Sequence, residues 1–98
     1  MFELIVLEEA KEELVEAALY YELQKAGLGE RFSLAVKKQI DVILRTPKLY
    51  QRKKKEYREA LIKPFPFLLV YRIDSTKNRI VVVSVFHTKR NPKHKHGK

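Results

Sequence analysis

The 98-residue sequence predicts an α+β domain in which one sheet carries a helical hairpin on one face. Two apolar runs of strand length, 67–73 and 80–86, flank a polar turn and predict an antiparallel β-hairpin. Two stretches with apolar residues at helical spacing, 8–26 and 30–45, are joined by a Gly-Leu-Gly connection, which predicts an αα-hairpin. A short apolar run at residues 2–7 precedes them. The predicted order is therefore β-α-α-β-β-β, an N-terminal strand and a helical hairpin followed by a three-stranded antiparallel meander.

The N-terminal run is expected to be a strand because it is apolar apart from Glu3. Four glutamates follow within the next seven residues, and negative charge in the first turn of a helix is favourable against the helix dipole. The first helix should end near Ala26, because Gly27 adopts the left-handed conformation at little cost. Its core-facing positions are Ala10, Leu14, Ala17, Ala18 and Tyr21.

The second helix is expected to begin near Glu30 and to stop at Thr46 and Pro47. Its apolar positions are Phe32, Val36, Ile40, Ile43 and Leu44. Each helix is interpreted as having one apolar stripe, and the sheet is the only large apolar surface left to cover both stripes.

The last two strands are the central strands of the predicted sheet. Phe67 to Val70 is apolar without alternation, which is typical of a strand buried on both faces. Alternation predicts that the side chains of the last strand fall into two sets. One set is Val81, Val83, Val85 and His87, and the other is Ile80, Val82, Ser84 and Phe86. The register between strands does not follow from the sequence, so whether His87 and Arg72 share a face stays open.

Composition limits the class of protein. A chain of this length forms one domain, residues 1–98, with a single modest core. The absence of cysteine excludes disulfides and thiolate sites. No apolar run is long enough to span a membrane, and the N-terminus lacks the features of a signal peptide. We therefore expect a cytoplasmic protein without membrane contact.

Charge is distributed unevenly along the chain, whose net charge is +9. Residues 1–30 carry two basic and eight acidic side chains, a balance of −6, whereas residues 31–98 carry nineteen basic and four acidic side chains, a balance of +15. Clustered cations attract a polyanion or an acidic protein. The second part of the chain is therefore expected to bind such a partner; solubility alone is the alternative interpretation.

His87 ends an apolar strand beside Lys89 and Arg90, and it is the candidate acid or base of an RNA-cleaving site. In such a site arginines stabilise the negative charge of the pentavalent transition state. Glu56 or Glu59 would be the second partner in proton transfer. The alternative is a structural histidine that forms a local hydrogen bond at the end of the strand.

The C-terminal residues, about 89–98, are basic and are expected to form a poorly ordered tail. His94 and His96 alternate with lysines there. Because lysines repel a metal cation and no carboxylate is near, we expect neither a metal site nor a cofactor.

Four stretches of the sequence carry a family resemblance. They are ALYYELQKAGLGERF in the helical hairpin, TPKLY after the second helix, YREALIKPFPFLLVYRI in the sheet, and VVVSVFHTKRNP at the end. Together they resemble the RelE/ParE toxins of bacterial type II toxin–antitoxin systems, also described as plasmid stabilisation proteins. The resemblance covers nearly the whole chain and implies a fold that agrees with the predicted order of elements.

The resemblance implies one of two activities. RelE-type members cut messenger RNA on the ribosome, whereas ParE-type members inhibit DNA gyrase by protein contact. In the nuclease branch an arginine stands in the central strand three residues before the tyrosine of the VYR motif, where this chain has Leu68. Nuclease members also often carry a C-terminal tyrosine, where this chain has Thr88. The resemblance therefore favours a ParE-like gyrase inhibitor, which is not an enzyme.

Two alternatives stay open. If the chain is a ribosome-dependent mRNA endonuclease, or mRNA interferase, the candidate catalytic residues are His87, Arg58, Arg72 and Arg90. The other alternative is an inactive toxin homologue that acts only as an antitoxin-binding partner.

In every case the resemblance implies a cognate antitoxin. An acidic, partly disordered antitoxin segment is expected to fold over the basic sheet and to form a toxin–antitoxin hetero-oligomer. The expected antitoxin- or nucleic-acid-binding residues are Arg52, Lys53, Lys54, Lys55, Arg58, Arg72, Lys89 and Arg90.

Overall fold

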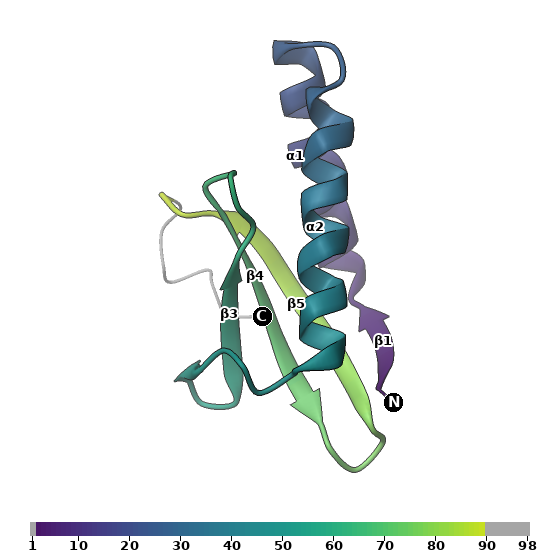
Figure 1. Cartoon of the computed structure of the whole chain (residues 1–98), viewed down its shortest axis with the longest axis vertical. Coiled ribbons are helices and arrows are strands. Elements are labelled where there is room, and N and C mark those ends of the chain that lie inside the picture. Colours follow the sequence, from purple (N-terminus) through teal and green to yellow (C-terminus); the bar gives the residue numbers. More distant parts are fainter. Residues whose placement is uncertain (1, 90–98) are drawn as a thin grey trace.

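The computed structural model describes residues 2–89 and confirms the predicted α+β fold class (Figure 1). Its elements in chain order are β1 (Glu3–Val6), α1 (Glu8–Gln24), α2 (Leu28–Arg45), β2 (Arg52–Lys54), β3 (Tyr57–Leu61), β4 (Phe67–Asp74) and β5 (Arg79–His87). The predicted tail lies outside the described residues except for Lys89, and so do Arg90, His94 and His96.

The strands form one mixed sheet in the order β1-β5-β4-β3-β2. β1 pairs with β5 in parallel, and the other neighbours pair antiparallel. Two features go beyond the predicted meander. The N-terminal strand joins the sheet beside β5, and the cationic stretch Arg52–Lys54 forms a short edge strand on β3.

The two helices form an antiparallel hairpin that lies on one side of the sheet (Figure 1). Gly27 has a φ of 90° and makes the left-handed turn that the sequence predicted. The Glu22 carboxylate accepts hydrogen bonds from the backbone N–H groups of Gly27 at 2.9 Å and Gly29 at 3.0 Å, which satisfies donors at the start of α2. Neither helix is long and apolar enough to cross a membrane.

The main core lies between the helices and the sheet. Tyr21, Phe32, Phe65 and Phe67 form an aromatic cluster there, with ring centroids 4.8 Å apart for Tyr21 and Phe65 and 5.1 Å apart for Phe32 and Phe67. The opposite face of the sheet carries a second, smaller apolar cluster whose buried members are Val70, Val81, Val83 and Phe86. β4 and β5 are therefore apolar on both faces, as their sequence predicted.

Helix α1 has a second apolar stripe, so the interpretation of one stripe per helix was wrong for α1. Ala10 and Ala17 are buried against the core as predicted. Val15, Leu19 and Leu23 lie on the outer side instead, with 67%, 57% and 79% of their surface exposed. Their spacing of four residues keeps them in one row along the helix.

Candidate functional site

Strand β5 contains a β-bulge at Val83, which determines the face of the sheet on which the following side chains of β5 lie. Val70 of β4 lies opposite Ser84, and the next residue, Tyr71, lies opposite Val82. Val83 therefore has no residue opposite it on β4, and the alternation of side chains along β5 reverses at this point.

The bulge corrects the predicted alternation. Val81 and Val83 belong to the second cluster, whereas Val85 belongs to the main core under the helices. His87 lies opposite Phe67, which is also a main-core residue. The prediction that Val85 and His87 share a face with Val81 was therefore wrong, because one extra residue shifts all that follow to the other face.

Glu13 of α1 holds the bulge in place. Its Oε1 accepts hydrogen bonds from the backbone N–H of Val85 at 2.8 Å and from the Ser84 hydroxyl at 3.1 Å. Ser84 is 1% exposed, so its hydroxyl needs a partner inside the protein. Sequence reasoning treated Glu13 only as negative charge near the helix start. The signal that could have found it is its position between Ala10 and Ala17 on the buried side of α1.

His87 lies at the end of β5, beside two glutamates and an aromatic ring. Its ring meets the Phe67 ring edge-on, with centroids 5.3 Å apart. Nδ1 accepts a hydrogen bond from the backbone N–H of Lys89 at 3.1 Å, so the neutral imidazole carries its proton on Nε2. A cavity of about 150 Å³ beside it is lined by Glu13, Glu16, Ala17, Phe67, Val85 and His87. This arrangement matches the local, structural histidine that was the alternative interpretation.

The candidate arginines lie elsewhere on the sheet. Arg58 lies opposite Tyr71 and so faces the helices, and its guanidinium donates a hydrogen bond of 2.6 Å to the Tyr50 carbonyl. Arg72 lies opposite Val81, so it points from the other face. Leu68, which stands where the nuclease branch has an arginine, packs against the second cluster.

The described candidates for RNA cleavage do not converge. Arg72 and His87 occupy opposite faces, and Arg72 is five residues along β4 from the partner of His87, roughly 16 Å at strand spacing. Glu59 lies opposite Val70, on the face away from His87, and Glu56 lies in the exposed turn before β3. Within residues 2–89 the predicted acid, base and arginines are therefore not brought together in one site.

Cations gather at the β2–β3 edge of the sheet, and we call the set Arg52, Lys53, Lys54, Lys55 and Arg58 the basic edge. The three residues of β2 are exposed, as is Lys55, which takes a left-handed turn with φ of 53°. Arg52 lies directly opposite Arg58, a pairing of like charges that is unfavourable unless an anion lies between or over them. The basic edge is therefore suited to an acidic partner.

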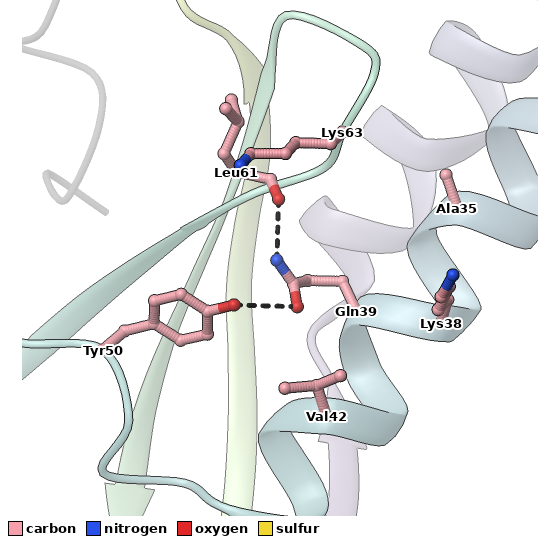
Figure 2. A pocket seen from close by; sticks show the side chains of 7 residues that line it. All are labelled: Ala35, Lys38, Gln39, Val42, Tyr50, Leu61 and Lys63. Carbon is pink, nitrogen blue, oxygen red and sulfur yellow. Dashed lines mark hydrogen bonds between the residues drawn. The ribbon is translucent and has the colours of Figure 1, made fainter.

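A hydrogen-bonded network joins Tyr50, Gln39 and Leu61 (Figure 2). The Tyr50 hydroxyl donates to Gln39 Oε1 at 3.1 Å, and Gln39 Nε2 donates to the Leu61 carbonyl at 2.7 Å. These contacts tie α2, the segment after it, and β3 together. The groove beside them has a volume of about 350 Å³ and is lined by Ala35, Lys38, Gln39, Val42, Tyr50, Leu61 and Lys63.

Tyr71 anchors the same segment from the core. Its hydroxyl donates a hydrogen bond of 2.7 Å to the Pro47 carbonyl. Burial raises the pKa of Tyr71 from 10.0 to about 12, although the Arg58 guanidinium acts in the opposite direction. Tyr71 is therefore neutral at physiological pH and has a structural role.

The remaining predicted cation, Lys89, lies at the other end of the sheet. His87, two residues before Lys89, lies opposite Phe67, the first residue of β4. Arg58 of the basic edge lies opposite Tyr71, four residues further along β4. The expected binding residues are thus split between three places: the basic edge, the face of the sheet that carries Arg72, and the end of β5 at Lys89. Within residues 2–89 no group of three or more His, Asp or Glu side chains is arranged to hold a metal ion.

A helical hairpin on one face of a mixed sheet is a fold that this chain shares with solved structures from ParDE and RelBE toxin–antitoxin systems. A sequence profile for the ParE toxin of the type II toxin–antitoxin system parDE matches residues 4–92, and the chain belongs to this family.

Solved structures share the fold at low sequence identity. The chromosomal ParDE system of P. aeruginosa matches with a TM-score of 0.75 and 12% identity, covering 89% of this chain and 96% of that one. The intact E. coli RelBE toxin–antitoxin complex matches with a TM-score of 0.64 and 22% identity, covering 92% and 100%. The isolated E. coli RelE toxin matches with a TM-score of 0.64 and 21% identity, covering 97% of this chain and 93% of that one. No curated protein matches the chain.

Proposed function

We propose that this ParE-family toxin inhibits DNA gyrase by direct protein contact and is neutralised by a cognate antitoxin. Membership of the family supports the toxin role. Gyrase as the target follows from the ParE-type resemblance of the sequence, and the arrangement of the candidate residues favours it over RNA cleavage.

The observation that carries the proposal is the separation of Arg72 from His87. Acid–base cleavage of RNA needs the proton-transfer groups within hydrogen-bond reach of the reacting phosphate and needs cations beside it. Here Arg72 and His87 point from opposite faces of the sheet, and Leu68 fills the central-strand position with an apolar side chain. A toxin with this arrangement of side chains is expected to act by binding its target protein rather than by cleaving RNA.

The antitoxin is proposed to bind across the basic edge. Related toxins of this fold are found in ParDE and RelBE toxin–antitoxin systems, which supports the same kind of partner here. The like-charged pair Arg52 and Arg58 would be relieved by carboxylates of an acidic segment. The groove beside Tyr50 and Leu61 adds an apolar surface next to these charges.

The experiment uses the purified, antitoxin-free chain in two parallel assays. One measures supercoiling of plasmid DNA by gyrase, and the other measures the integrity of messenger RNA in a cell-free translation reaction. The proposal predicts that supercoiling stops while the message stays intact. Cleavage of the message only when ribosomes are present would establish the mRNA-interferase alternative, and inactivity in both assays would favour the antitoxin-binding homologue without toxicity.

A further inference from the structure

The outer side of α1 presents a continuous apolar row. Val15, Leu19 and Leu23 follow one another at intervals of four residues and are more than half exposed. A groove of about 430 Å³ runs beside this row, between α1 and the first turns of α2. It is lined by Leu14, Val15, Ala18, Leu19, Glu22, Gly29, Glu30 and Ser33. Single exposed leucines are ordinary, but a row beside a groove is typical of a helix-docking surface.

The rim of this surface is acidic. Glu8, Glu12 and Glu16 are exposed on α1 between and beside the apolar residues, and Lys11 is the only cation of α1, where it lies 4.0 Å from Glu8. The N-terminal thirty residues carry a net charge of −6. A partner for this surface must therefore present an apolar side chain flanked by cations.

The outer side of α2 has this chemistry. Leu34 is 58% exposed, and the exposed residues Arg31, Lys37, Lys38 and Arg45 lie on the same helix. Lys37 pairs with Asp41 at 3.6 Å, which leaves three cations on α2 without an ion pair in residues 2–89. The carbon stems of lysine and arginine add apolar surface around Leu34.

We propose that a second copy of this chain docks on the helical hairpin, with α1 of each copy packed against α2 of the other. A two-fold axis parallel to the helices produces both contacts at once, because the interface is isologous. Leu34 of one copy meets the row Val15, Leu19 and Leu23 of the other, and the acidic rim meets the cations of α2. The paired helices then run antiparallel.

The proposed dimer leaves the basic edge free. β2 and β3 lie at the sheet edge opposite β1, whereas the hairpin covers one face of the sheet (Figure 1). The dimer surface therefore lies apart from the basic edge, although Lys38 of α2 also lines the groove beside that edge. Self-association is therefore independent of whether the target is gyrase or RNA.

Sedimentation equilibrium of the purified, antitoxin-free chain over a wide concentration range tests the proposal. We expect a mass twice that of the 11.6 kDa chain at high concentration and low salt. Leu19→Asp and Leu34→Asp should each weaken the dimer by about tenfold or more, and added salt should weaken the wild-type dimer. Leu49→Asp is the matched control, because Leu49 is 59% exposed but lies outside the hairpin.

A wild-type chain that stays monomeric at every concentration contradicts the proposal. A dimer that dissociates equally with Leu49→Asp, or that survives both hairpin substitutions, contradicts it as well. If the chain is monomeric and Leu19→Asp instead weakens binding of the antitoxin, the surface belongs to the antitoxin and the second copy is excluded.

Discussion

Arg72 and His87 lie on opposite faces of the sheet, opposite Val81 and Phe67 respectively. The bulge at Val83 determines the face on which His87 lies, because without the extra residue the side chain of His87 would share a face with Val81. One extra residue in β5 therefore places these two candidate side chains on opposite faces, in addition to their separation of roughly 16 Å along the strands.

Removal of the Glu13 carboxylate is predicted to destabilise the fold. In Glu13→Ala the buried Ser84 hydroxyl and the Val85 N–H lose a charged acceptor, which should cost about 1.5–3 kcal/mol. Urea denaturation measures the loss. Glu12→Ala, an exposed change on the same helix, should stay within about 0.5 kcal/mol. Equal effects of the two substitutions would show that Glu13 does not hold the bulge.

Gly29→Ala is predicted to destabilise the protein, although alanine is normally the better helix residue by about 1 kcal/mol. A Cβ at position 29 would lie 2.5 Å from the Ala18 carbonyl oxygen, so the two helices would have to separate. We expect a loss of about 1–3 kcal/mol in the free energy of unfolding. Ser33→Ala, one turn further and exposed, is the control and should be nearly neutral. A stabilised Gly29→Ala variant would mean that the helices are not this close.

The pH dependence of stability should report on Tyr71. Its pKa is about 12 in the folded protein and about 10 in the unfolded chain, so the unfolded state loses its proton first as pH rises. The free energy of unfolding should therefore fall between about pH 10 and pH 12. Tyr71→Phe should lack this part of the fall and should lose about 1 kcal/mol at neutral pH with the hydrogen bond to Pro47. Parallel pH curves for the two proteins would contradict the assignment.

Reversal of charge at the basic edge is predicted to weaken antitoxin binding. The double variant Lys53→Glu and Lys54→Glu should lower affinity by about tenfold or more and should reduce its salt dependence, because fewer cations then face the acidic segment. Isothermal titration calorimetry at two salt concentrations measures both effects. Lys77→Glu, an exposed change in the turn between β4 and β5, should leave affinity unchanged. An equal loss with Lys77→Glu would indicate attraction by net charge alone.

Much of the fold follows from local chemistry in the sequence. The helical spacing of Phe32, Val36 and Ile43 predicted the buried side of α2, and all three are buried. Gly27 predicted the turn between the helices because its left-handed φ excludes most other residues. The ends were less accurate: α1 stops at Gln24 rather than near Ala26, and α2 begins at Leu28 rather than near Glu30.

The site was harder to predict because it depends on contacts between distant segments. The bulge at Val83 is held by Glu13, seventy-two positions before Val85, and no local pattern announces it. The cationic residues were found by composition, but the sequence did not show that Lys89 lies at the other end of the sheet from Arg52. The apolar row Val15, Leu19 and Leu23 was visible at helical spacing and was overlooked beside the buried stripe.

The most direct test of the central claim compares the wild-type toxin with His87→Ala in the gyrase supercoiling assay and the translation assay. Stability of the variant is checked first, because the contact with Phe67 contributes about 0.5–1.5 kcal/mol. The contact mechanism predicts that both proteins inhibit supercoiling equally and that both leave messenger RNA intact. Ribosome-dependent cleavage of the message by the wild type, abolished in a folded His87→Ala variant, would contradict it.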